Sequence, residues 1–191
     1  MKKFLFSITF LCLSLICFAQ TYEDYSKYEV RYEPDRSVYF EFGVGAFIPN
    51  DDSNTFTGID LEVGRYFNDY IGAGLNFKYS SESEWKDELN YIGPKFRYRV
   101  YYEPRSLFDI DLYAGIGYGW YRYKEYYDGY YEAAETMNYV VPNIGISTYI
   151  NFGKNVALGF EPGFMWYCST DLNKSQSVGV WTIQGKCKIT F

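Results

Sequence analysis

The sequence predicts an all-β protein, an eight-stranded antiparallel up-and-down transmembrane β-barrel. Three observations support this fold class. Apolar residues recur at every second position along eight segments of about ten to twelve residues, the pattern of strands with two unlike faces. Turn-forming residues separate these segments, and charged residues fall almost entirely on one face of each. At about 3.3 Å per residue and a tilt of roughly 40°, such strands rise about 25 Å, the height of an outer-membrane apolar band.

The closing segment, Ser177–Phe191, shows the alternation most clearly. One face carries Phe, Ile, Cys, Gly, Ile and Trp, and the other carries Thr, Lys, Lys, Gln and Thr. Seven earlier segments share this period, and we expect strands at Val38–Ile48, Thr57–Phe67, Tyr70–Ser80, Leu89–Tyr101, Phe108–Trp120, Val140–Ile150 and Val156–Trp166. Short turns alternate with longer connections, the longest at 121–138. We therefore expect the short turns and both termini on the periplasmic side.

The distribution of charge separates a membrane barrel from a soluble one. A soluble eight-stranded barrel, such as a lipocalin, packs apolar side chains inside and presents polar ones to water. Here the apolar face is nearly free of charge, and its exception, Arg65, lies at a strand end where a long side chain can snorkel. We expect the apolar face to contact lipid and the charged face to line a narrow lumen.

The charged face carries acidic and basic residues in equal number. They are Glu41, Asp60, Glu62, Lys78, Lys95, Arg97, Arg99, Asp109, Asp111, Glu161, Lys186 and Lys188. We interpret them as an ion-pair network that fills the lumen, not as catalytic carboxylates, because an unpaired charge there would be buried. Inward glycines would make room for these long side chains. Those glycines are Gly43, Gly45, Gly72, Gly74, Gly115, Gly117 and Gly119.

Turn positions predict specific cross-strand pairs within this network. A hairpin centred on Pro104 places Arg97 opposite Asp111 and Arg99 opposite Asp109. The same reasoning for the other strands predicts Asp60 opposite Lys78, Lys186 opposite Glu161, and Glu41 opposite Lys188. Opposite charges at such positions stabilise a sheet modestly in water and more where water is scarce.

Three prolines, Pro94, Pro142 and Pro162, lie inside predicted strands. A closed barrel has no edge strand on which a missing N–H group costs nothing. All three fall on the apolar face, and the alternation continues through Pro94 and Pro162. We expect local distortion at these positions, not strand ends.

The dipeptide Asp128-Gly129, within the longest connection, is typical of a hairpin turn. A two-residue turn would put Tyr118 and Val140 on opposite faces, so we expect a three-residue turn or a β-bulge. The hairpin would then project above the membrane as a candidate extracellular binding surface, because tyrosine gives a large contact area at low entropic cost. Its tyrosines are Tyr121, Tyr123, Tyr126, Tyr127, Tyr130, Tyr131 and Tyr139. The alternative is an aromatic belt without a partner.

Residues 1–19 are typical of a secretory signal peptide. Two lysines precede the apolar run Phe4–Phe18, and Ala19 occupies the expected cleavage position. About fifteen apolar residues are too few for a transmembrane helix. A lipoprotein signal fits less well, because Cys17 follows two bulky residues. Residues 20–37 are polar without a sustained period, and we expect a flexible periplasmic arm.

Removal of the signal peptide would leave two cysteines, Cys168 and Cys187. In the expected topology Cys168 lies at the outer end of its strand and Cys187 near the periplasmic end of the neighbouring strand. Their Cα atoms should be farther apart than the roughly 7 Å that a disulfide permits. We expect two thiols.

The closing strand and the aromatic-rich rim resemble the small outer-membrane β-barrel family that includes OmpA and OmpX, with its porin-family barrel domain. The resemblance covers Val38–Phe191 and rests on pattern. The family's closing signal usually has Gly five residues before the last aromatic, whereas Gly185 lies six before Phe191. The resemblance implies the outer membrane of a Gram-negative bacterium and insertion by the barrel-assembly machinery. The residues of the implied C-terminal insertion signal are Trp181, Ile183, Ile189 and Phe191.

Composition narrows the function classes. The chain contains no His, the usual general base and the commonest nitrogen ligand of metals, so we expect no enzyme, no metal site and no cofactor. A net charge of -6 argues against a nucleic-acid partner. We expect a structural or surface-interaction protein whose partners are outer-membrane lipid and an extracellular or envelope protein. The alternative is a small-solute porin, although side chains normally fill an eight-stranded lumen.

Overall fold

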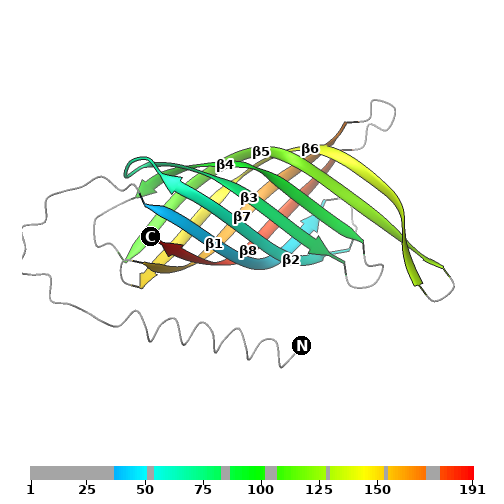
Figure 1. Ribbon diagram of the computed structural model, residues 1–191, viewed down its shortest axis with the longest axis horizontal. Coiled ribbons are helices and arrows are strands. Elements are labelled where there is room, and N and C mark those ends of the chain that lie inside the picture. The colour runs from blue at the N-terminus through cyan, green and yellow to red at the C-terminus, as the bar shows by residue number, and fades with distance from the viewer. Residues whose placement is uncertain are drawn as a thin grey trace, which may run out of the picture.

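Eight antiparallel strands form one closed barrel in the computed structural model (Figure 1). Each strand pairs with its neighbour in sequence and β8 pairs with β1, so the predicted up-and-down barrel is confirmed. The structure describes residues 37–50, 54–82, 87–101, 107–127, 130–152, 155–170 and 177–191, without the side chains of residues 101, 124–127 and 130–134. The predicted signal peptide and residues 20–36 of the arm lie outside these residues. The described part contains no helix long and apolar enough to cross a membrane.

The strand boundaries follow the alternation of the sequence closely. The strands are β1 (Val38–Pro49), β2 (Phe56–Tyr66), β3 (Ile71–Ser81), β4 (Glu88–Tyr101), β5 (Phe108–Tyr127), β6 (Tyr130–Phe152), β7 (Val156–Ser169) and β8 (Ser177–Thr190). Six of them end close to the predicted positions, because a period of two with β-branched and aromatic residues is sufficient to define a strand. β5 and β6 are much longer than predicted.

The β5–β6 hairpin occupies the segment 121–138, which was predicted to be a connection containing a projecting hairpin. Tyr118 pairs with Val140 and Tyr123 with Glu135, but Lys124 pairs with Ala133, so one extra residue bulges out of β6. The predicted bulge is confirmed, and it keeps the apolar residues of both strands on the same face. Figure 1 shows the hairpin extending past the end of the barrel that lies away from the C-terminus. We call this the hairpin end and the other the termini end.

The pairing register fixes how strongly the strands are inclined. Stepping around the barrel from Tyr39 through paired residues returns to β1 at Pro49, ten residues farther along the strand. The intermediate partners are Gly64, Gly74, Lys95, Gly115, Asn143, Met165 and Val180. Eight strands with such a stagger are steeply tilted and enclose an interior just wide enough for side chains.

The exterior of the barrel is apolar and the interior is charged. Leu75, Phe96 and Ile144 point outward and are 57%, 60% and 61% exposed, whereas Glu41 and Asp60 point inward and are fully buried. A water-soluble barrel has the opposite polarity. The predicted assignment of the apolar face to lipid therefore agrees with the exposed surface of the closed barrel.

Each of the three prolines interrupts the hydrogen-bond ladder with one of its two neighbouring strands, but none of them ends a strand. Pro94 pairs with Leu75, but the β4–β5 ladder skips it. Pro142 and Pro162 likewise each pair with one neighbouring strand and are skipped in the β6–β7 ladder. The register is unchanged across each gap, so the predicted local distortion is confirmed.

Two of the predicted strand registers are correct and two are wrong by two residues. Asp60 lies opposite Lys78 and Glu41 opposite Lys188, as predicted. Arg97 lies opposite Tyr113 and Arg99 opposite Asp111, not Asp109, and an irregularity follows Arg99. Lys186 lies opposite Gly159, while Glu161 faces Gln184. The errors arise where the turn centre was inferred from one proline and where a long connection fixes no register.

The two described cysteines lie at opposite ends of the β7–β8 pair. Cys168 pairs with Ser177 at the hairpin end, and Cys187 pairs with Leu158 near the termini end. Both are thiols, as predicted.

Candidate functional site

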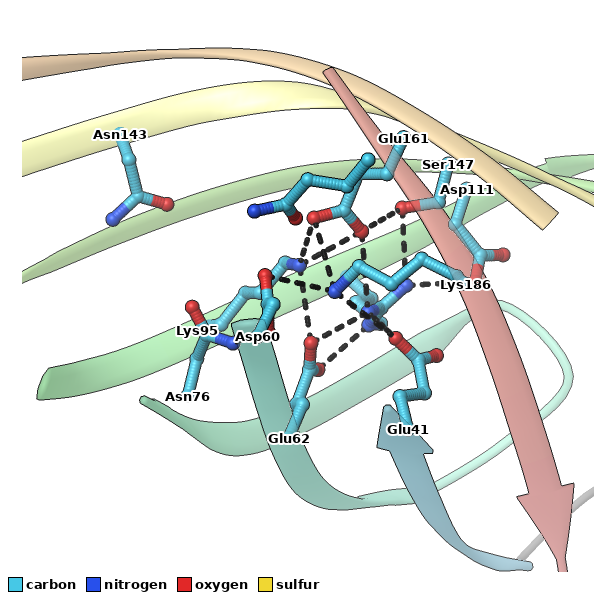
Figure 2. Close-up of polar contacts among 12 residues, drawn as sticks. Glu41, Asp60, Glu62, Asn76, Lys95, Asp111, Asn143, Ser147, Glu161 and Lys186 are labelled. Carbon is cyan, nitrogen blue, oxygen red and sulfur yellow. Dashed lines mark hydrogen bonds and ion pairs between the residues drawn. The ribbon is translucent and has the colours of Figure 1, made fainter. Parts of the chain in front are cut away.

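The charged residues converge on the barrel axis because they occupy alternate positions on seven of the strands (Figure 2). Eleven of the twelve predicted residues make ion pairs inside the lumen, and we call them the ion-pair network. They are Glu41, Asp60, Glu62, Lys78, Lys95, Arg97, Arg99, Asp111, Glu161, Lys186 and Lys188. The twelfth, Asp109, is buried at the termini end opposite Tyr149.

Arg97 lies at the centre of the ion-pair network. Its Nη2 atom is 2.5 Å from Glu41 and 2.6 Å from Glu62, and Nε donates a second hydrogen bond to Glu62. Asp111 and Glu161 lie 3.5 and 3.6 Å from its guanidinium. One guanidinium therefore neutralises carboxylates from four strands, a task suited to its planar array of donors.

Three lysines complete the neutralisation on the side toward the hairpin end. Lys95 lies 2.8 Å from Glu161 and 3.0 Å from Glu62. Lys186 lies 2.9 Å from Asp60 and 3.4 Å from Glu161, although Glu161 is not its cross-strand partner. Lys78 pairs with Asp60. The backbones of Lys186 and Glu161 are not opposite each other, but their long side chains still meet inside the barrel.

Tyrosine rings line the termini end of the lumen, and the sequence reasoning did not single them out. Lys188 lies 5.2, 4.7 and 4.5 Å from the ring centres of Tyr39, Tyr66 and Tyr149. The three hydroxyls donate to Glu62, Asp111 and Glu41 respectively. Each ring therefore contributes apolar bulk, a face for a cation and a donor for a carboxylate.

Inward glycines make room for rings as well as for charged side chains. A Cβ at Gly43 would lie 2.7 Å from Lys186, which agrees with the predicted role of such glycines. At Gly64, however, a Cβ would lie 2.3 Å from the Tyr39 hydroxyl, and at Gly163 it would lie 2.0 Å from the Tyr113 hydroxyl. The alternation of the sequence shows that these two tyrosines face inward. It does not show that each ring packs against a glycine on another strand.

An apolar cluster occupies the hairpin end of the lumen, and the sequence reasoning did not identify it either. Its buried members, which we call the apolar cap, are Phe47, Phe56, Leu89, Tyr91, Tyr139, Val141, Met165, Tyr167 and Val180. They lie on the inward face of their strands, beyond the ion-pair network. The signal that could have identified them is the change from charged to apolar residues along the inward face.

The predicted hairpin tyrosines do not form a single surface. Tyr139 is 5% exposed and belongs to the apolar cap, so its assignment to an extracellular surface is wrong. Tyr121 is partly buried and donates a hydrogen bond to Asp87, whereas Tyr123 is exposed. The side chains of Tyr126, Tyr127, Tyr130 and Tyr131 lie outside the described residues.

The residues of the implied insertion signal lie on the outer face of the barrel. Trp181, Ile183 and Phe191 are exposed, and Ile189 shares their side of β8 with partial exposure. Trp181 stacks edge-on against Phe164 of β7. Across the described part of the chain, no group of three or more His, Cys, Asp or Glu could hold a metal ion.

No protein-family model and no curated protein matches the chain. Among solved structures, Neisserial surface protein A aligns with a TM-score of 0.55 and 14% identity over 81% of this chain and 96% of its own. The N-terminal β-barrel domain of Pseudomonas aeruginosa OprF has a TM-score of 0.53 and 12% identity, over 83% of this chain and 100% of its own. Ail, the attachment invasion locus protein of Yersinia pestis, has a TM-score of 0.53 and 16% identity, over 84% and 100%.

These three solved structures share the fold of the chain. The polarity of the two faces of the barrel shows which environment this fold is suited to. A closed eight-stranded barrel with an apolar outer face and a charged interior is an outer-membrane β-barrel. The chain has the OmpA/OmpX-like architecture that its sequence pattern predicted.

Proposed function

We propose that the protein is a non-conducting outer-membrane barrel that serves as a rigid support for the projecting β5–β6 hairpin. One observation carries the proposal: the lumen is filled while the hairpin extends beyond it. Arg97 bridges carboxylates from β1, β2, β5 and β7, and the apolar cap covers the network at the hairpin end. In this proposal the protein is neither a porin nor an enzyme, and it has no cofactor.

The filled lumen argues against solute passage on energetic grounds. A continuous pathway would require separating ion pairs such as Arg97–Glu62 and Lys95–Glu161, whose members are buried. Breaking a buried pair by removing one partner costs about 3–5 kcal/mol, because it leaves an uncompensated charge. Several such pairs must open together, since each carboxylate shares cations with its neighbours.

Conductance in planar bilayers tests the closed lumen. We expect the protein, inserted at a level confirmed by its unheated gel mobility, to give no unit conductance steps where a porin prepared identically gives them. Reproducible steps that scale with the amount of inserted protein would contradict the proposal and support the small-solute porin.

The hairpin is suited to interaction because its outer part is not incorporated into the barrel wall. The β4–β5 ladder ends with Glu88 opposite Arg122, and the β6–β7 ladder ends with Tyr139 opposite Ser169. Beyond these pairs, β5 and β6 pair with each other as a two-stranded ribbon. The names of two structural neighbours, a surface protein and an attachment protein, are consistent with such a role.

Deletion of the ribbon tests its role. We expect a variant in which residues 124–134 are replaced by an Asn-Gly turn, which joins the paired residues Tyr123 and Glu135, to fold and insert normally but to lose the protein partner cross-linked from intact outer membranes. A matched variant that keeps the ribbon but replaces Tyr126, Tyr127, Tyr130 and Tyr131 with Ser separates ring contacts from backbone pairing. An unchanged set of cross-linked partners in the deletion variant would contradict the proposal.

The remaining parts of the proposal concern biogenesis. Residues 1–19 would direct export and be removed near Ala19, residues 20–37 would form a periplasmic arm, and the barrel-assembly machinery would insert residues 38–191. The outward position of Trp181, Ile183 and Phe191 is consistent with a signal read from outside the closing strand.

A further inference from the structure

Four buried, uncharged polar side chains lie where the ion-pair network meets the apolar cap. These residues, which we call the polar layer, are Asn76, Asn143, Thr182 and Gln184. On β8, Thr182 and Gln184 lie between Val180 of the cap and Lys186 of the network. Figure 2 shows Asn76 and Asn143 on one side of the network, away from Asp111 and Glu41.

Each member of the polar layer has one polar atom without a hydrogen-bond partner among the described residues. These atoms are Asn76 Oδ1, Asn143 Oδ1, Thr182 Oγ1 and Gln184 Nε2. All four residues are at most 6% exposed. Buried polar atoms are almost always hydrogen-bonded to protein or ordered water, so four such atoms in one layer require a ligand.

The orientation of two of the three amides, Asn76 and Gln184, is fixed by the hydrogen bonds that they make. Asn76 Nδ2 donates to Asp60 at 2.6 Å, and Gln184 Oε1 accepts from Lys78 at 3.1 Å. Exchanging nitrogen and oxygen would place an oxygen against a carboxylate at Asn76 and a donor against an ammonium at Gln184. Asn143 Nδ2 donates to the Tyr91 hydroxyl, which could equally donate to an oxygen in that place, so Asn143 keeps one unsatisfied atom in either orientation. The unsatisfied atoms therefore do not result from reversed amides.

On one of its two neighbouring strands each of these residues faces a glycine, which has no side chain to offer as a hydrogen-bond partner. Gln184 lies opposite Gly45 and Thr182 opposite Gly163. Asn76 and Asn143 also each have a glycine, Gly93 and Gly115, on one neighbouring strand.

The mixture of atoms identifies the class of ligand. Asn76 Oδ1 only accepts hydrogen bonds, whereas Gln184 Nε2 only donates them. A cation would satisfy the acceptors alone and an anion the donor alone, but water serves both. We propose that the polar layer holds internal water molecules, as a hydration site enclosed where the ion-pair network meets the apolar cap.

This hydration site is independent of whether the lumen conducts. Each internal water makes about three hydrogen bonds, so the four atoms need about two waters, completed by bonds to each other and to neighbouring groups. The surrounding side chains of the apolar cap and the ion-pair network slow the exchange of these waters with bulk water. The lumen is then wet at its centre and closed at both ends.

Water oxygen-17 magnetic relaxation dispersion on the protein extracted from membranes into detergent tests the proposal, because it detects only waters that stay bound for longer than nanoseconds. We expect a signal for about two such waters in the unaltered protein. Thr182→Val and Asn143→Leu should each lower it by about one water. Thr148→Val, whose hydroxyl lies outside the barrel and bonds to Phe160, is the matched control and should leave it unchanged.

The signal of the unaltered protein decides the matter even if one variant does not fold, as judged by its unheated gel mobility. Absence of long-lived water in the unaltered protein would overturn the proposal, as would equal signals in all folded variants. A shift in unfolding midpoint when one cation or anion replaces another at fixed ionic strength would assign the site to an ion instead. A crystal structure with waters on Gln184 Nε2 and Asn143 Oδ1 would give the same support as the expected relaxation signal.

Discussion

Replacing Arg97 with Met is expected to lower the free energy of unfolding by about 3–5 kcal/mol. Methionine fills much of the volume but leaves Glu41 and Glu62 without the guanidinium that lies within 2.6 Å of both. Asp111 and Glu161 lose their weaker contacts as well. Urea titration in detergent, followed by the loss of the fast-migrating folded band on unheated gels, measures the change.

Arg122→Met is the matched control for this prediction. Arg122 lies at the hairpin end of the β4–β5 ladder, its side chain is 49% exposed, and it forms a 3.5 Å ion pair with Glu88. An exposed pair of this kind contributes about 0–1 kcal/mol, so its loss should change the midpoint little. Equal destabilisation by Arg97→Met and Arg122→Met would show that the ion-pair network contributes no more to the stability of the barrel than an exposed ion pair does.

Gly64→Ala, which adds a single methyl group, is expected to disrupt the packing of side chains at the termini end of the lumen. The new Cβ would lie 2.3 Å from the Tyr39 hydroxyl and 2.8 Å from the backbone oxygen of Ala73. Tyr39 would have to leave its place beside Tyr66 and release its hydrogen bond to Glu62. Overpacking of this kind costs about 1–3 kcal/mol, to which the loss of the hydroxyl contact adds about 1 kcal/mol.

Gly185→Ala provides the opposite expectation on the closing strand. A Cβ there points outward, and the nearest atom, the Val44 backbone oxygen, lies 4.0 Å away. Alanine reduces the freedom of the unfolded chain, so the substitution should be neutral or stabilising by about 0.4–1 kcal/mol. If Gly64→Ala and Gly185→Ala gave the same unfolding midpoint, close packing around Tyr39 could not be a determinant of stability.

The sequence was sufficient to predict which side chains face the lumen, because a strand places alternate residues on opposite faces regardless of its partners. Glu41, Arg97 and Glu161 could be assigned to the interior on that basis. Register was predicted correctly only where a short turn or the closure of the barrel constrained it, as for Asp60 and Lys78. It was wrong where a bulge near Arg99 or a long connection before β8 left the pairing free to shift.

The contents of the lumen could be predicted less well than its polarity. Long side chains reach across the axis, so Lys186 contacts Glu161 although their backbones are not opposite each other. The rings around Lys188 come from β1, β2 and β6 and depend on the stagger of the whole barrel. The apolar cap shares the inward parity of the charged residues, and only its position along the axis distinguishes it.

The ion-pair network and the apolar cap support the proposed function in different ways. The network joins strands that are not neighbours, as when Arg97 of β4 contacts Glu41 of β1, and it therefore stiffens the barrel across its width. The cap covers the network at the end from which the β5–β6 hairpin projects. In the proposed function, the network and the cap together give the hairpin a rigid base and leave no open path for solutes.

The most direct test of the account is the environment of outward side chains in the membrane. Leu75→Cys, Phe96→Cys and Ile144→Cys, each in a chain whose Cys168 and Cys187 are replaced by Ser, would carry a nitroxide spin label in native outer membranes. We expect all three labels to relax with oxygen, which dissolves in lipid, and to be shielded from a water-soluble nickel complex. A label at Asn54, an exposed connecting residue, should respond to nickel. Nickel accessibility at Leu75, Phe96 and Ile144 equal to that at Asn54 would contradict the account, because it would place the apolar face of the barrel in water.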